Sequence, residues 1–188
     1  VKVHTSPSLK EVKKRLTIIA PGASNDESFI SFIRDNHLSI PNKVRLVLRS
    51  NDREFESESL LIYNKKLDEK QYFNNIANSD FTLLPYGTNY NYRTSGVYFE
   101  SLIYGKPVIV DGRSTLRYYH EKHPNIVLTF DGHRGFLKML EGIQSKRTED
   151  LEGDFTKALN EYSDERIRAS FLSILCNNSC EETVLNQF

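Results

Sequence analysis

The stretch from Arg93 to Glu100 combines side chains that could bind a phosphate group and a diol. It opens a helix-length segment, and the unpaired amides and partial positive charge of a helix N-terminus attract anions. Arg93 would add a guanidinium and Ser95 a hydroxyl, with Thr94 beside them, and Gly96 has no Cβ to keep a ligand from the backbone. Glu100 follows Gly96 by four residues on the same helix face, where its carboxylate could accept two hydrogen bonds from a ribose. Together these features favour a nucleoside diphosphate.

Each of these residues also has a purely structural interpretation. Gly96 could serve packing or a turn, and Glu100 could be an exposed helix residue. Arg93 could be a solvated loop residue, and Ser95 or Thr94 could act only as the N-cap of the helix. Their coincidence at one loop and helix start is what favours a binding site.

Two apolar runs flank this segment and would position it. Phe81–Leu84 and Val108–Val110 predict buried strands, and Ser95–Tyr104 predicts the helix between them. Gly105 would close the helix, and Pro107 would prevent its continuation. A strand–helix–strand unit has a right-handed crossover and parallel strands, which places the loop and the helix start at the carboxyl edge of the sheet. Open α/β sheets bind their ligands at that edge.

The same alternation of strands and helices continues along most of the chain. Further strands are predicted at Leu16–Ala20, Val44–Leu48, Leu60–Tyr63 and Ile126–Phe130, with Arg49–Ser59 as a loop. Helices are predicted to begin near Asn25 and after Asp68, from the capping-box spacings Ser24/Glu27 and Asp68/Gln71, and to cover Ser114–His123, Gly132–Ile143 and Glu149–Leu175. This pattern predicts an α/β fold, a Rossmann-like, doubly wound and mainly parallel sheet of about six strands with helices on both faces.

Length and composition limit the classes of protein. The 188 residues suggest one generous domain, here residues 16–162, with 1–15 as a linker or arm and 163–188 as a C-terminal helical tail. Lys and Arg number 25, as do Asp and Glu, so the charge does not favour nucleic-acid binding. No apolar run approaches transmembrane length. The chain begins with Val, and we expect a fragment of a longer protein. Cys176 and Cys180 are expected to be reduced thiols in a cytosolic protein.

The segment Ala77–Val110 resembles the donor half of glycosyltransferases with the GT-B fold, especially retaining enzymes that use nucleotide sugars. The shared pattern begins with Ala and Asp before an apolar strand that ends in Pro, here Ala77–Pro85. A loop, a small residue, a helix that bears a Glu, and Gly-Lys-Pro-Val follow, the last at Gly105–Val108. The resemblance implies that the chain is one half of a GT-B architecture.

The resemblance also implies roles for particular residues. Glu100 occupies the position of the Glu that binds the nucleotide ribose in the family, so the helix start at Ser95 and Gly96 would meet the diphosphate. Many retaining members carry an earlier Glu with seven residues between the two, and here that position is Tyr92. This departure puts the donor-sugar contact in doubt. Tyr92, like Tyr86 and Tyr90, could stack on a sugar or base or could pack over the sheet edge.

The phosphate-binding cations are less clearly indicated. The family often has an Arg in the loop after the first strand, where this chain has PGASND. Arg49, Lys65 and Arg93 remain as basic candidates for the phosphates, with a solvated surface charge as the favoured interpretation of Lys65. By position in the family, Asn64–Leu67 would contact the base.

The resemblance implies a glycosyltransferase that moves a sugar from a nucleoside-diphosphate sugar to a glycan or lipid-linked acceptor, with retention and without a cofactor. No Asp-x-Asp occurs, so a metal-independent enzyme is expected, and His120 and His123 are expected to be surface or helix-face residues. No catalytic residue is assigned. An N-terminal acceptor-binding domain would be needed for activity, and the protein would be cytoplasmic, associated with the inner face of the membrane only through that domain. A role in polysaccharide biosynthesis is implied.

Two other functions stay open at this point. A non-catalytic nucleotide-sugar-binding or interaction module would explain Tyr92 in place of Glu. A sugar-nucleotide epimerase of related fold is the other alternative, disfavoured by the Gly-Lys-Pro-Val segment. A nicotinamide-dependent dehydrogenase is not favoured, because no G-x-G-x-x-G follows the first strand.

Overall fold

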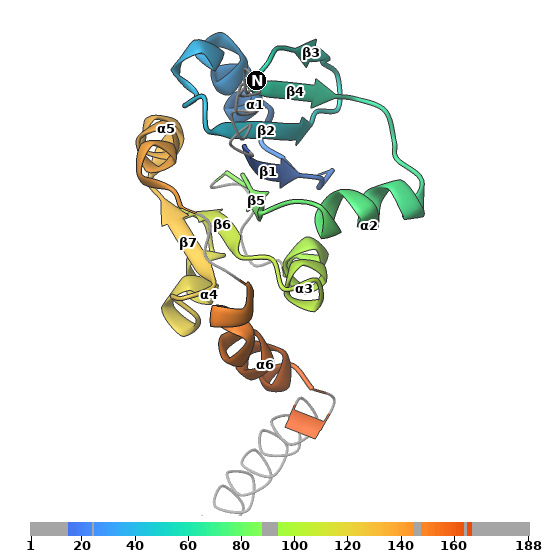
Figure 1. Cartoon of the computed structure of the whole chain (residues 1–188), viewed down its shortest axis with the longest axis vertical. Helices are drawn as coiled ribbons and strands as arrows, with labels where there is room; N and C mark the ends of the chain where they lie inside the picture. Colours follow the sequence, from blue (N-terminus) through green and yellow to red (C-terminus); the bar gives the residue numbers. More distant parts are fainter. Residues whose placement is uncertain (1–14, 24, 88–93, 145–147, 164, 167–188) are drawn as a thin grey trace, which may run out of the picture.

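The fold is built on one seven-stranded sheet. A computed structural model describes residues 15–23, 25–87, 94–144, 148–163 and 165–166. The strands are β1 (Leu16–Ala20), β2 (Val44–Arg49), β3 (Phe55–Glu56), β4 (Leu60–Tyr63), β5 (Phe81–Leu84), β6 (Val108–Asp111) and β7 (Val127–Phe130). They lie in the order β3-β4-β2-β1-β5-β6-β7 (Figure 1), and every neighbouring pair is parallel except β3 with β4. The predicted α/β fold class is therefore confirmed.

Helices connect these strands and cover the sheet. They are α1 (Glu27–Asp35), α2 (Glu69–Ala77), α3 (Gly96–Ile103), α4 (Arg117–Lys122), α5 (Gly132–Gly142) and α6 (Glu152–Glu161), with 3₁₀ turns at His37–Ser39 and Thr148–Leu151. The capping box predicted at Asp68 and Gln71 is present at the start of α2. Gly105 follows the end of α3 with a φ of 61°, the left-handed conformation that favours glycine there.

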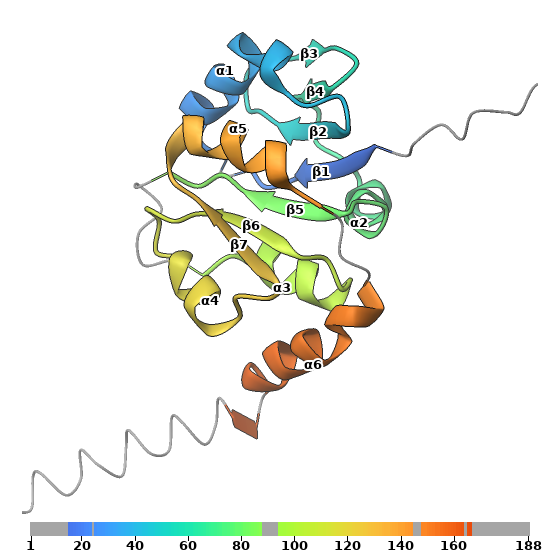
Figure 2. The ribbon, with the colours of Figure 1, turned by 60° about the vertical axis from the view of Figure 1, so that its left-hand side comes forward.

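Apolar side chains alternate between two cores on opposite faces of the sheet, as successive strand residues must. On β6, Ile109 points into one core, and Val108 and Val110 point into the other. The first core is closed by α1 and α5, which lie next to each other (Figure 2), through Phe29, Ile30, Ile33, Phe136 and Leu140. The second is closed by α3, α4 and α6, through Tyr98, Leu102, Tyr119, Phe155 and Ala158. Both faces are covered, which is why the strands are continuous apolar runs.

Helix α1 begins at Glu27 with Asp26 as its N-cap, because the Asp26 carboxylate accepts hydrogen bonds from the Ser28 backbone amide and hydroxyl. Ser24 of the expected Ser24/Glu27 box lies outside the described residues. Two other local predictions were wrong. Strand β2 extends to Arg49, and the expected loop after it contains the short strand β3. The long helix expected over Glu149–Leu175 is interrupted, since α6 ends at Glu161.

The histidine expectation was also wrong for one residue. His123 is buried beneath α6, with Nε2 3.4 Å from Oε2 of Glu161, instead of lying on the surface. His120 is half-buried, and its Nδ1 lies 2.6 Å from the carbonyl oxygen of Val127. None of the described helices is long and apolar enough to cross a membrane. The cysteines lie outside the described residues, and the domain boundaries stay predictions.

Candidate functional site

The chain reverses its direction of winding between β1 and β5. Without β3, the six parallel strands follow the order 3-2-1-4-5-6 of doubly wound nucleotide-binding sheets, whose ligands bind where the order reverses. The loops after β1 and β5 meet at this point, because the Asp26 amide donates a hydrogen bond of 3.0 Å to the Pro85 carbonyl oxygen. The carboxyl edge beside β1 and β5 is therefore the place to examine for a site.

Tyr86 fills the space between these two loops and the start of α3. It is buried, and a Cβ on Gly22 would come within 2.7 Å of its hydroxyl oxygen. The same hydroxyl lies 3.4 Å from Oγ of Ser95. Of the two interpretations left open for Tyr86, packing over the sheet edge is the one observed. Tyr90 and Tyr92 lie outside the described residues.

The N-terminus of α3 is capped by Ser95 and opens beside Gly96. Ser95 is buried, and its Oγ accepts a hydrogen bond of 3.4 Å from the Tyr98 amide. Its hydroxyl therefore serves the helix, as in the structural interpretation. Gly96 and Thr94 are exposed, and among the described residues the atom nearest to a Cβ on Gly96 would be Oε1 of Glu100, at 4.0 Å. No described side chain crowds this position, and a ligand could approach the backbone there.

Glu100 lies one turn further along α3 and contacts a second helix. Its Oε2 accepts a hydrogen bond of 2.5 Å from the hydroxyl of Tyr72 on α2. Burial, and then the hydrogen bond to and negative charge of Glu100, raise the pKa of Tyr72 well above its ordinary value. The phenol therefore stays protonated and donates to the carboxylate at every physiological pH. Glu100 is half-buried and held, instead of being the free surface residue of the alternative interpretation.

A cavity of about 410 Å³ opens at the carboxyl edge on the other side of Tyr72. Its walls come from the loop after β1, the ends of β2 and β4, and the start of α2: Pro21, Arg49, Tyr63, Lys66, Leu67, Asp68, Glu69 and Tyr72. Nε of Arg49 and the hydroxyl of Tyr63 are buried and have no hydrogen-bond partner within the described part of the chain. Burial raises the pKa of the Tyr63 hydroxyl, and the Arg49 charge opposes that rise. Unpaired buried groups of this kind are costly unless a ligand satisfies them.

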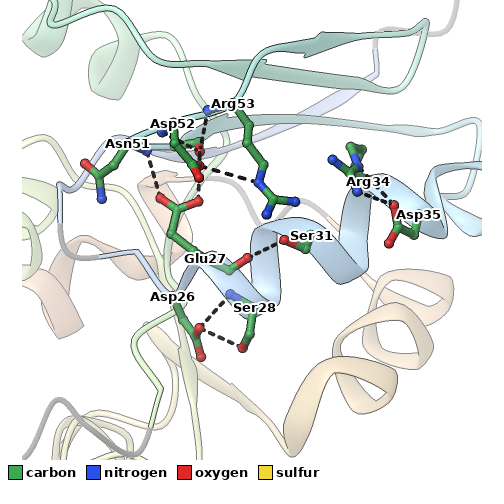
Figure 3. A network of polar contacts seen from close by, with 10 residues as sticks. Asp26, Glu27, Ser28, Ser31, Arg34, Asp35, Asn51, Asp52 and Arg53 are labelled. Carbon is green, nitrogen blue, oxygen red and sulfur yellow. Dashed lines mark hydrogen bonds and ion pairs between the residues drawn. The ribbon is translucent and has the colours of Figure 1, made fainter.

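A polar network fixes the end of β2, from which Arg49 extends. Asn25 donates from Nδ2 to the carbonyl oxygens of Ala20 and Arg49, at 3.0 and 2.8 Å. Glu27 reaches from the start of α1 to the loop after β2 (Figure 3). There its carboxylate accepts hydrogen bonds from the Ser50 hydroxyl at 2.8 Å and from the backbone amide of Asn51 at 2.7 Å. The β1 loop, α1 and the β2 loop are thus joined, so this wall of the cavity is pre-formed.

A second charged group lies further along the same edge, after β6. Arg113 donates to the carboxylate of Asp111 through Nε at 3.0 Å and Nη2 at 2.6 Å. The hydrogen bond to Asp111, with the nearby charges of Asp111, Asp131 and Asp26, raises the pKa of Arg113. This guanidinium is already paired with carboxylate, which leaves less of its charge for a phosphate.

The structure thus brings some of the expected site residues together. Gly96, Ser95 and Glu100 share the start of α3, and Arg49 lines the adjoining cavity. Lys65 is exposed and is not among the residues that line the cavity. Arg93 and Tyr92 lie outside the described residues.

Sequence reasoning missed Tyr72 and Tyr63 as members of this edge, whereas Lys66 and Leu67 belong to the segment expected to contact the base. Lys66 lies inside the segment Asn64–Leu67, so its position after the third parallel strand was a usable signal. Across the described residues, no three or more His, Cys, Asp or Glu side chains are grouped so that they could hold a metal ion.

Comparison with known proteins finds similarity in structure alone. No family model matches the sequence, and no curated protein is significantly similar to it. The N-terminal domain of trehalose-6-phosphate phosphatase from Candida albicans superposes with a TM-score of 0.61 at 12% identity, over 89% of this chain and 42% of that one. The glycotransferase of kitacinnamycin superposes with a TM-score of 0.54 at 14% identity, over 92% of this chain and 46% of that one.

These two similarities establish a shared fold. At such identities they support a GT-B-like, Rossmann-like arrangement of strands and helices. The chain spans less than half the length of either structure. The site itself offers an exposed helix N-terminus at Gly96, a carboxylate held by Tyr72, and a cavity beside Tyr72.

Proposed function

We propose that the chain is the donor-binding half of a glycosyltransferase and binds the nucleoside diphosphate of a nucleotide sugar. The observation that carries this proposal is the position of Glu100, between the open start of α3 and the cavity beside Tyr72. The α3 amides at Gly96 bind the diphosphate, and the Glu100 carboxylate binds the ribose hydroxyls. The base enters the cavity, where Arg49 and Tyr63 meet its polar edge.

Two facts support the proposal that the chain is part of a longer glycosyltransferase. The chain resembles the donor half of retaining GT-B enzymes over Ala77–Val110, and a structure named as a glycotransferase shares its fold while being about twice as long. We infer that the donor sugar passes to a glycan or lipid-linked acceptor held by an N-terminal domain, with retention and without a metal ion. On this proposal the protein acts in the cytoplasm in polysaccharide synthesis.

Calorimetric titration with UDP, GDP, ADP and CDP tests the proposal. A thermal-shift screen first selects the diphosphate, because a ligand that binds the folded chain stabilises it. Glu100→Ala should weaken the selected diphosphate by about tenfold or more, roughly the value of a hydrogen bond to a charged group. Glu141→Ala is the matched control, because Glu141 is an exposed glutamate on α5.

The outcomes separate clearly. Binding that Glu100→Ala weakens and Glu141→Ala leaves unchanged supports the donor site. Binding of none of the four diphosphates, or equal affinity in all three proteins, contradicts it.

One alternative function is favoured by a specific residue. Tyr92 stands where retaining members carry a Glu, which suits a nucleotide-sugar-binding module without catalysis. A transfer assay on the chain joined to its N-terminal domain distinguishes the two, since the binding module would bind the donor and form no product.

A further inference from the structure

Tyr72 and Glu100 form the contact that joins α2 to α3 at the candidate site. The two residues are 28 positions apart, and their hydrogen bond of 2.5 Å has the length of a charge-assisted O–H···O⁻ bond. Tyr72 also lines the cavity, so one side chain touches both parts of the proposed nucleotide site.

The Tyr72 ring is itself held in place. Its edge packs against Phe73 at a centroid distance of 5.2 Å, and Phe73 stacks on Tyr104 of the α3 C-terminus at 5.8 Å. Burial raises the pKa of the phenol, so the hydroxyl remains a donor. A fixed ring with a permanent donor holds the Glu100 carboxylate in one orientation.

That orientation matters because a carboxylate can accept about four hydrogen bonds. Tyr72 uses one position on Oε2, while Oε1 lies within 4.0 Å of the place where a Cβ on Gly96 would be. The remaining acceptor positions therefore face the start of α3, where the ribose would follow the diphosphate. Without the phenol, Glu100 would have to lose its side-chain freedom at the moment of binding.

We propose that Tyr72 is a positioning residue that orients Glu100 toward the two ribose hydroxyls and so makes the chain select ribonucleotides over 2′-deoxyribonucleotides. This inference rests on the proposed function and adds the residue that sets the sugar preference of the nucleotide site. Tyr72 acts through Glu100, so its effect should vanish when Glu100 is removed.

The test is a double-mutant cycle in which the measured quantity is the ratio of affinities for a ribonucleotide and its 2′-deoxy counterpart. Wild type, Tyr72→Phe, Glu100→Ala and the double variant are titrated by calorimetry with the diphosphate that binds among UDP, GDP, ADP and CDP, and with its 2′-deoxy counterpart. We expect wild type to prefer the ribonucleotide by about tenfold, the value of a hydrogen bond to a charged group. Tyr72→Phe should cut that preference to about threefold, by weakening the ribonucleotide and hardly changing the deoxyribonucleotide.

The cycle and its controls separate positioning from structure. In the Glu100→Ala background, Tyr72→Phe should change the preference by less than about twofold, since residues that act through one another are non-additive. Tyr98→Phe, a buried tyrosine on α3 that packs on Tyr119 in the other core, should keep the wild-type preference. Circular dichroism melts without ligand confirm that each variant is folded.

Each contrary result has a distinct meaning. If Tyr72→Phe keeps the wild-type preference for the ribonucleotide, the positioning role is overturned. If Tyr72→Phe binds the ribonucleotide more tightly than wild type does, the role is also overturned, because Tyr72 would then compete with the ribose for Glu100. Equal loss for both nucleotides also overturns it, because that is what a structural role produces. If Glu100→Ala weakens diphosphate binding but Tyr72→Phe leaves the preference for the ribonucleotide unchanged, only this inference fails and the proposed function stands. If wild type binds no diphosphate, the proposed function fails with it.

Discussion

Asp26 and Glu27 are neighbours in sequence that act on different parts of the molecule. Asp26 accepts hydrogen bonds from the backbone amide and hydroxyl of Ser28 at the start of α1, whereas Glu27 holds the loop after β2. Glu27 is the first residue of α1, so its carboxylate lies at the helix start beside the next loop. Its hydrogen bonds with Ser50 and Asn51 stabilise the cavity wall that carries Arg49, so one residue links local helix structure to the site.

His123 gives a prediction about acid stability. Burial lowers the pKa of His123, and the Glu161 carboxylate 3.4 Å away opposes that shift. The unfolded chain therefore binds a proton at His123 as the pH falls through about 6.5, while the folded chain resists it. Stability should fall with acidification below that pH, and His123→Leu should reduce the fall.

The measurement is the free energy of unfolding in urea at pH 7.5 and 5.5 for both proteins. The difference between the two pH values isolates His123, because the other titrating groups are common to both proteins. A steeper acid loss in His123→Leu than in wild type would show that the Glu161 charge dominates and would contradict the prediction.

At the scale of elements, two glycines of α5 should respond oppositely to the same substitution. Gly132 has a φ of 67°, and its Cβ would lie 3.3 Å from Nη1 of Arg113, so Gly132→Ala should cost about 1–2 kcal/mol. Gly135 lies within the helix, with only an ordinary contact of 3.8 Å to Asp131, so Gly135→Ala should stabilise the fold by roughly 0.5–1 kcal/mol. Thermal unfolding of the two variants checks both signs, and a stabilised Gly132→Ala variant would refute the conformational argument.

The elements that sequence predicted well are those with local signals. Long apolar runs gave six strands at nearly the observed positions, and Asp68 with Gln71 marked the start of α2. Strand β3 was missed because two residues among charged neighbours carry no periodicity, and it forms only by pairing with β4. The end of α6 at Glu161 was not predicted, because no glycine or proline follows it to indicate a helix end.

The candidate site was only partly predictable, because local sequence signals place only those residues that are close together in the chain. Gly96 and Glu100 are one turn apart, so helical spacing alone could place them together. The hydrogen bond from the Tyr72 hydroxyl to Glu100, and that from the Asn51 backbone amide to Glu27, join residues 28 and 24 positions apart and depend on how the helices and loops pack. Tertiary packing supplies such contacts, and no local pattern encodes them.

At the scale of the whole molecule, ligand binding and catalysis should separate. On the proposed function, the 188-residue chain carries the donor site and lacks the acceptor domain. The selected diphosphate at about 100 times its Kd should add about 2.7 kcal/mol to the unfolding free energy and raise Tm by roughly 5–11 °C. The same chain, incubated with the corresponding nucleotide sugar and a glycan acceptor, should form no product.

Differential scanning fluorimetry measures the first part and chromatography of the reaction mixture the second. Glu100→Ala should abolish most of the rise in Tm at the same ligand concentration. Robust transfer by this chain alone would contradict the division of labour between two domains.

Strand β3 also affects self-association of the protein, because it forms one edge of the sheet. An open sheet edge is a template on which a foreign strand can pair, and proteins guard such edges with short, charged strands. Here Glu54 and Glu56 flank and occupy this two-residue strand and are both exposed, while the exposed Glu58 is paired with Arg15. A second copy aligned on β3 would set the carboxylates of Glu54 and Glu56 beside their own counterparts. Self-association through this edge is thereby discouraged.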